Sequence, residues 1–183
     1  MNIKRRVVTH LPEELVEFEP MLQRIYASRG IVKKIELDKH LNQLLPFDGL
    51  LGLDATSARL AHALKAQERI LIVGDFDADG ATSSALAVSA LRAMGAKHVE
   101  FLVPNRFEFG YGLTPGIIGV AKRWNPHVIV TVDNGIASFE GVLAAREAGI
   151  DVLVTDHHLA ADTLPEALAI VNPNQPGDKF PSK

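Results

Sequence analysis

Residues 69–80 read RILIVGDFDADG, an apolar run followed by three carboxylates at alternate positions, Asp75, Asp77 and Asp79. The β-branched and aliphatic residues 70–73 are typical of a buried strand. Carboxylates this close repel one another, so the pKa of at least one should be raised unless a cation neutralises them. The stretch therefore predicts a strand that ends at a metal site.

Short runs rich in Ile and Val alternate with helical segments over the rest of the chain. Expected strands lie within 70–75, 99–104, 127–133, 151–158 and 168–173, and expected helices within 82–95, 116–124 and 138–149. Such alternation is typical of βα units on a parallel sheet with both faces covered. We therefore predict an α/β fold with a doubly wound, mainly parallel sheet flanked by helices.

The first 69 residues are patterned differently. Weak helical patterns at 19–30 and 54–67 predict an N-terminal helical cap over residues 1–69, before a second domain at 70–183. Asp54 is expected to cap the N-terminus of the helix within 54–67.

Composition limits the classes of protein. The chain has 183 residues, 47% of them hydrophobic, no cysteine and a net charge of −3. No apolar stretch is as long as a membrane span, and the basic start lacks the apolar core of a signal peptide. We expect a soluble, cytoplasmic monomer without a membrane partner, and only oxygen and imidazole ligands remain for a metal.

Polar residues follow two further predicted strands. Asp133 and Asn134 come after one strand, and Asp156, His157 and His158 end another. In a doubly wound sheet, ligands bind beyond the carboxyl ends of the strands. Each residue alone could be a capping acid or a turn residue, but together they favour one site.

Two other motifs share the D-x-D pattern. An EF-hand loop needs a bidentate Glu at its twelfth position, where this chain has Leu86, and a preceding helix where a strand is expected. A haloacid-dehalogenase-type phosphotransferase also has a D-x-D pair after its first strand. That alternative leaves the paired histidines without a role.

Four ordered motifs carry a resemblance: DFDADGATSSA at 75–85, PNRFEFGYGL at 104–113, VTVDNGI at 130–136 and VTDHH at 154–158. Together they resemble the DHH phosphoesterase family, and within it the RecJ-type single-strand-specific 5′→3′ exonucleases. IYASRGI at 25–31 and LLPFDGLLGL at 44–53 resemble the leading segment of the bacterial members. The chain is thus expected to be the N-terminal portion of such a protein, with a DHH domain at 70–183 that is incomplete at its C-terminus.

The resemblance implies a centre with one or two Mn²⁺ or Mg²⁺ ions. Its implied metal ligands are Asp75, Asp77, Asp79, Asp133 and His157. Its implied catalytic residues are Asp77, Asp79, Asp133, His157 and His158. Many family members have a ligating His where this chain has Val73, and Asp75 is expected to fill that gap. Asp156 is expected to orient a neighbouring ligand.

Further residues are assigned to substrate binding: Arg106, Gly110, Tyr111, Gly112, Asn134 and His158. Arginine suits bidentate phosphate contacts, and glycine lets a backbone approach a phosphate closely. Phe107, Phe109 and Tyr111 alternate at strand spacing, which fits either stacking on unpaired bases or core packing. His158 could contact the phosphate or assist proton transfer, or could simply face solvent.

The resemblance implies a metal-dependent exonuclease of DNA repair and recombination that releases 5′-mononucleotides by water attack on the phosphodiester. Its substrate would be single-stranded DNA with a free 5′ end, and its partners a single-strand-binding protein and a helicase. Two alternatives stay open. One is a phosphoesterase of the same family acting on short oligonucleotides or nucleotide phosphates, and the other is a non-catalytic binding module for DNA or a replication factor.

Overall fold

The computed structural model describes residues 7–182, which form parts of two compact units, residues 1–46 and 47–183. The described part of the first unit holds α1 (Pro20–Ser28) and three short 3-10 turns, Glu13–Leu15, Lys34–Leu37 and Leu41–Gln43. Leu15 is fully buried, and the rings of Phe18 and Tyr26 meet edge to face. The contacts place residues 47–69 with the second unit, and the functional division at residue 69 stays a prediction.

The second unit is built on five parallel strands. They are β1 (Ile70–Gly74), β2 (Val99–Leu102), β3 (Val128–Val132), β4 (Asp151–Thr155) and β5 (Ala169–Val171). The order across the sheet is β2-β1-β3-β4-β5. Because every pair is parallel, the carboxyl ends of β1, β3 and β4 meet at one edge of the sheet.

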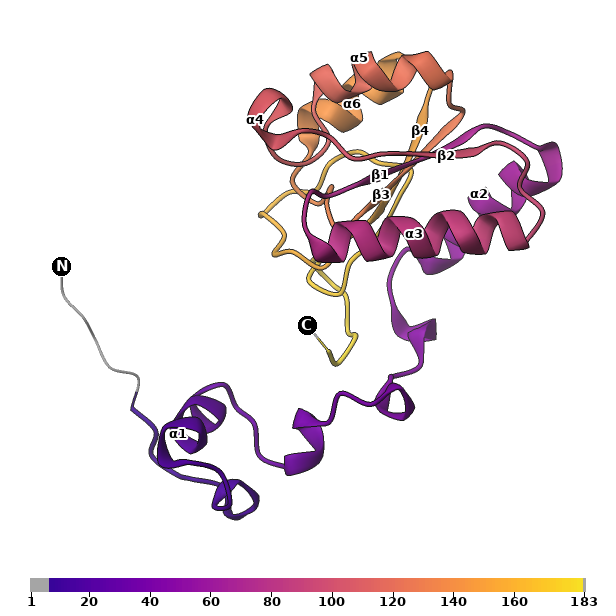
Figure 1. The fold of residues 1–183 in the computed structure, drawn as a ribbon. Coiled ribbons are helices and arrows are strands. Elements are labelled where there is room, and N and C mark those ends of the chain that lie inside the picture. The colour runs from indigo at the N-terminus through magenta and orange to yellow at the C-terminus, as the bar shows by residue number, and fades with distance from the viewer. Residues whose placement is uncertain (1–6, 183) are drawn as a thin grey trace. The chain divides into compact units, whose positions relative to one another are not determined.

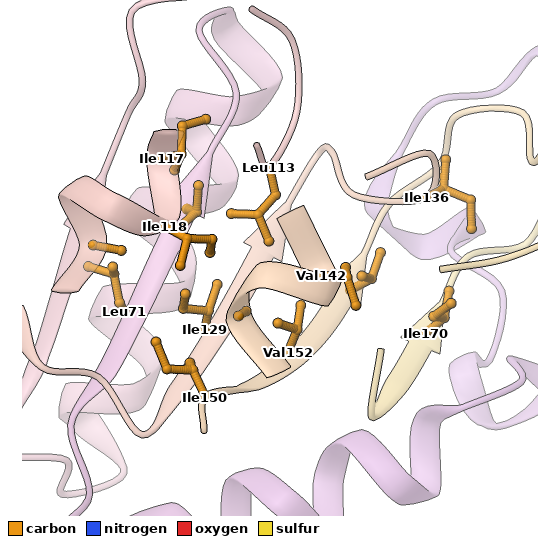
Figure 2. Close-up of a cluster of buried hydrophobic side chains, with 14 residues drawn as sticks. Leu71, Leu113, Ile117, Ile118, Ile129, Ile136, Val142, Ile150, Val152 and Ile170 are labelled. Carbon is orange, nitrogen blue, oxygen red and sulfur yellow. The ribbon is translucent and has the colours of Figure 1, made fainter. Parts of the chain in front are cut away.

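Helices cover both faces of this sheet. Figure 1 shows α3 (Ala78–Ala93) along one face and α5 (Pro115–Ala121) with α6 (Phe139–Glu147) over the other. Alternate strand residues serve the two layers: Leu71, Ile129 and Val152 pack beneath α5 and α6 (Figure 2), whereas Ile70 and Ile72 belong to the core beneath α3. The predicted doubly wound α/β fold is confirmed.

The start of α2 (Leu53–Ala66) differs from the prediction. Gly52, not Asp54, is the N-cap, and Asp54 lies in the first turn. Gly52 has φ of 78°, and a Cβ there would lie 2.0 Å from the carbonyl oxygen of Ile170. The close approach of the α2 start to β5 therefore needs glycine, which a search for capping side chains does not detect.

None of the helices within residues 7–182 has the length and apolarity that crossing a membrane would need.

Candidate metal and phosphate site

The first carboxylates lie where β1 gives way to α3. Asp77 is the N-cap of α3, and its Oδ1 accepts a hydrogen bond of 3.1 Å from the backbone N–H of Gly80. This hydrogen bond holds the pKa of Asp77 below its usual value. Gly80 packs against Asp75 so closely that a Cβ would lie 2.3 Å from the Asp75 carbonyl oxygen. In the Asp-x-Asp-x-Asp-Gly motif, β1 and α3 thus lie so close together that position 80 has no room for a side chain.

Asp133 follows β3 in the left-handed backbone region, with φ of 61°. The side-chain amide of the next residue, Asn134, donates to the carbonyls of Val73 (3.1 Å) and Val132 (2.9 Å), which ties the ends of β1 and β3 together. Burial raises the pKa of the Asp133 carboxyl, and the neighbouring Asp77 adds to the rise, while a hydrogen bond with His157 opposes it. The buried end of β3 therefore presents a carboxylate whose charge lacks full compensation.

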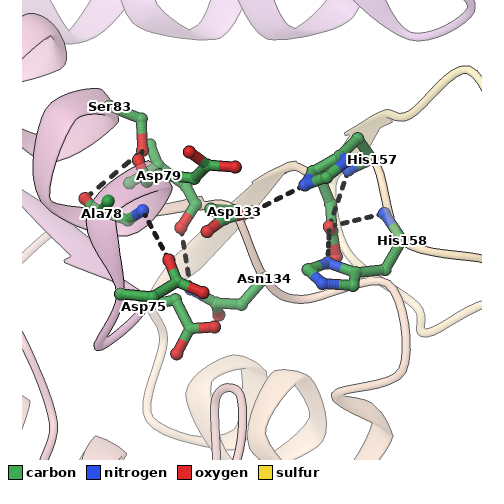
Figure 3. A network of polar contacts seen from close by, with 12 residues as sticks. Asp75, Ala78, Asp79, Ser83, Asp133, Asn134, His157 and His158 are labelled. Atoms are coloured by element: carbon green, nitrogen blue, oxygen red, sulfur yellow. Dashed lines mark hydrogen bonds and ion pairs between the residues drawn. The ribbon is translucent and has the colours of Figure 1, made fainter.

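Asp156 organises the paired histidines after β4. Its buried carboxylate accepts hydrogen bonds from the backbone N–H of Ile136 (2.9 Å), His157 (2.7 Å) and His158 (3.0 Å), and contacts His158 Nδ1 at 2.7 Å. Burial disfavours a charged His158 imidazole, but the hydrogen bond to Asp156 and the negative charges of Asp156, Asp133 and Asp75 together outweigh burial, so the pKa of His158 is raised. His157 Nε2 lies 2.9 Å from Asp133 Oδ1, and Figure 3 shows the His157 ring directed at Asp133.

Two groups of side chains bring their potential ligand atoms within 4.8 Å of one another, Asp75 with Asp77 and Asp133, and Asp133 with His157 and His158. Asp133 is common to both. Carboxylate oxygens with one or two imidazoles and no thiolate suit Mn²⁺, and an oxygen-rich set suits Mg²⁺. The donors therefore fit the implied metal ions. Asp79 belongs to neither group and is exposed in the first turn of α3.

The segment after β2 lies against the carboxylates. It contains α4 (Arg106–Phe109), so Phe107, Phe109 and Tyr111, although at strand spacing in the sequence, do not lie along a strand. Phe107 is 94% exposed, whereas Phe109 packs on the core. The segment forms a helical turn rather than a strand because the Asn105 side chain caps it, accepting a hydrogen bond of 3.0 Å from the Phe107 N–H.

Arg106 and Tyr111 connect this segment to the two strand ends. Arg106 makes a bidentate ion pair with Asp75, with Nη2 to Oδ2 at 2.6 Å and Nε to Oδ1 at 3.1 Å. The Arg106 guanidinium lies 5.4 Å from the centre of the Tyr111 ring, and the Tyr111 hydroxyl lies 3.1 Å from His158 Nε2. Burial raises the pKa of Tyr111 to about 12, so its hydroxyl is protonated at neutral pH.

The predicted glycines flank Tyr111 in left-handed conformations, with φ of 78° at Gly110 and 72° at Gly112. A Cβ at Gly112 would lie 2.8 Å from Ser138 Oγ, while none of the described atoms lies within 4 Å at Gly110. Ser138 was missed by sequence reasoning. Its hydroxyl accepts from Leu113 N–H at 2.9 Å and so fixes the segment against the start of α6. It is the first residue of the helix predicted within 138–149, and that position gave no sign of a contact with Leu113.

Side chains from the α4 segment and from the ends of β1, β3 and β4 border a cavity of about 500 Å³. Asp75, Asp77, Arg106, Tyr111 and His158 form its polar wall. Ile136, Ala137 and Leu159 provide apolar surface. Of the predicted substrate-binding residues, the cavity thus brings together Arg106, Tyr111 and His158, while Asn134 is buried in the strand ends behind it.

A parallel sheet with carboxylates and histidines at one edge is the arrangement that the resemblance to the DHH phosphoesterases predicts. Residues 69–182 match the model of the DHH family, N-terminal domain, and the chain belongs to that family. The resemblance seen in the motifs is thereby confirmed.

The most specific similarities are to exonucleases. The chain is 49% identical over 182 residues to the single-stranded-DNA-specific exonuclease RecJ of Salmonella typhimurium and 48% identical over 183 residues to that of Escherichia coli. Each alignment covers the whole chain but only 32% of the relative, so the chain spans about a third of their length.

Two solved structures agree with this similarity. A crystal structure of exonuclease RecJ bound to manganese matches with a TM-score of 0.65 and 37% identity, over 74% of this chain and 34% of that one. RecJ of Thermus thermophilus in complex with Mn²⁺ matches with a TM-score of 0.62 and 33% identity, over 92% and 24% of the two chains.

Proposed function

We propose that this chain carries the metal-binding part of a single-stranded-DNA-specific 5′→3′ exonuclease that releases 5′-mononucleotides. One observation carries the proposal: Asp133 joins two ligand groups, and members of both groups, Asp75, Asp77 and His158, line one cavity together with Arg106. The similarity to RecJ exonucleases, two of them solved with manganese, supports this substrate and the choice of Mn²⁺. Mg²⁺ is the second candidate because the donors are mostly carboxylates.

Asp77, Asp133 and His157 would hold the metal, with Asp79 as a further ligand that the resemblance implies. Bound metal would supply a water of lowered pKa and neutralise charge on the phosphoryl oxygens. Arg106 binds the phosphate through the N–H groups that Asp75 leaves free. His158, oriented by Asp156 through Nδ1, presents Nε2 to the cavity for a phosphate contact or proton transfer.

The rest of the cavity suits a nucleotide. Gly110 and Gly112 let the backbone approach a phosphate, Tyr111 offers a ring for stacking, and Asn134 fixes the strand ends beneath the site. Ile136 and Leu159 supply an apolar wall that limits water. We infer a cytoplasmic monomer acting in DNA repair and recombination with a single-strand-binding protein and a helicase.

The test is release of 5′-mononucleotides from a 5′-phosphorylated single-stranded oligonucleotide, with and without Mn²⁺. Asp133→Ala should abolish release, whereas Asp162→Ala, at an exposed carboxylate outside the ligand groups, should leave it unchanged. Duplex DNA should be resistant. Preference for dinucleotides would favour a small-substrate phosphoesterase. Metal-independent binding of the oligonucleotide without release would favour a binding module.

A further inference from the structure

Both oxygens of the Asp75 carboxylate already accept hydrogen bonds within the protein. Arg106 donates to both of its oxygens, at 2.6 and 3.1 Å, and the backbone N–H of Phe76 donates to Oδ1 at 2.7 Å. The Asp75 side chain is only 6% exposed, while that of Asp77 is 57% exposed. Bidentate charge-assisted hydrogen bonds of this kind are among the strongest that a carboxylate makes. Asp77 is therefore open to a ligand in a way that Asp75 is not.

Arg106 in turn keeps part of its guanidinium free. The group has five N–H donors, and the pair with Asp75 uses the one on Nε and one on Nη2. The side chain is 39% exposed and lines the cavity with Asp77 and His158. The free N–H groups of Nη1 and Nη2 are thus held by a fixed salt bridge at the wall of the cavity.

The surroundings of Arg106 make this salt bridge important. Arg106 begins the single turn of α4, and the segment continues through Gly110 and Gly112, both left-handed. Its other close contacts are Tyr111, at 5.4 Å from the ring centre, and Asp77 Oδ2, at 3.6 Å from Nη2. A long side chain on so short an element has little else to fix its orientation, because side-chain freedom is lost only where contacts restrict it.

We propose that Asp75 is a positioning residue for Arg106 rather than a metal ligand, and that it aims the free guanidinium edge at a phosphate group of the substrate. The substrate part rests on the proposed function. This role for Asp75 also explains which of the closely spaced carboxylates needs a cation. Arg106 neutralises Asp75, so Asp77 and Asp133 form the pair that needs a cation.

The test compares Asp75→Asn, Arg106→Gln, the double variant, and Asp77→Asn as the comparison for a metal ligand. Isothermal titration with Mn²⁺ should give a Kd for Asp75→Asn within about twofold of wild type, whereas Asp77→Asn should weaken binding about tenfold or more. Equal loss of Mn²⁺ affinity in Asp75→Asn and Asp77→Asn would overturn the assignment, because it would make Asp75 a ligand.

Two further measurements follow the guanidinium itself. In NMR spectra without metal or DNA, the Arg106 Nε–Hε signal should be sharp and shifted in wild type and lost or averaged in Asp75→Asn; an unchanged signal would overturn the positioning role. With a 5′-phosphorylated phosphorothioate oligonucleotide and Mn²⁺, each single variant should weaken binding about tenfold and the double variant no further. Additive losses would contradict coupling of the two residues.

The measurements separate the two proposals. If wild type failed to bind the oligonucleotide, the proposed function and the substrate half of this inference would both be contradicted. The NMR signal would still decide whether Asp75 positions Arg106.

Discussion

Replacing Gly80 with Ala tests how the loop that carries Asp75, Asp77 and Asp79 is built. The new Cβ would lie 2.3 to 2.6 Å from backbone atoms of Asp75, where contacts under 3.0 Å are essentially never seen. The start of α3 must therefore move from β1 by about 0.7 Å, and a backbone neighbour cannot rotate away as a side chain can. Overpacking of this kind costs about 1–3 kcal/mol, and loss of the Asp77 cap adds about 1 kcal/mol. After subtracting about 1 kcal/mol for the helix propensity gained by Ala, we expect a net loss of about 1–3 kcal/mol.

The matched control is Gly119→Ala in α5, where none of the described atoms lies within 4 Å of the added Cβ. That variant should be unchanged or more stable by up to about 1 kcal/mol. Urea unfolding followed by circular dichroism measures both, and Mn²⁺ titration should show weaker binding in Gly80→Ala alone. Equal stability of Gly80→Ala and wild type would refute the close packing of strand and helix.

Three other predictions concern charge. Arg59 forms ion pairs with Glu68 at 2.7 Å and Asp151 at 2.6 Å, so Arg59→Met should lower the free energy of unfolding by about 3 kcal/mol. Lys65 is exposed on the same helix, and Lys65→Met should change the free energy of unfolding by no more than about 0.5 kcal/mol. Equal urea midpoints for the two variants would contradict this. Because burial raises the pKa of Asp133, its ionised form opposes folding without metal, so metal-free Asp133→Asn should be more stable than wild type at pH 7. That difference should shrink as the pH falls towards the ordinary carboxyl pKa of about 4, and a constant difference in thermal melts would count against it. Excess Mn²⁺ should raise the Tm of wild type but not of Asp133→Asn, and EDTA should reverse the rise.

The sheet and its functional edge were predictable from the sequence because local patterns carry them. Each strand is a short aliphatic run, and parallel pairing brings the ends of β1, β3 and β4 together regardless of loop detail. Asp77, Asp133 and His157 therefore converge as expected.

Other features depend on contacts between residues distant in the sequence. Asp75 and Arg106 are 31 positions apart, and no spacing rule indicates that a predicted metal ligand and a predicted phosphate contact bind each other. The start of α2 is set by the approach of Gly52 to β5, which overrides the preference for Asp54 as a cap. In the α4 segment, three aromatics lie at strand spacing in the sequence, but the Asn105 cap favours a helical turn.

The central claim is that the carboxyl ends of β1, β3 and β4 form one divalent-metal site. Isothermal titration of the protein with Mn²⁺ tests it most directly, with Asp133→Asn as the site variant and Asp162→Asn as the exposed control. We predict saturable binding in wild type and Asp162→Asn and none in Asp133→Asn, because Asp133 belongs to both ligand groups. Equal Mn²⁺ binding by all three proteins would contradict the site.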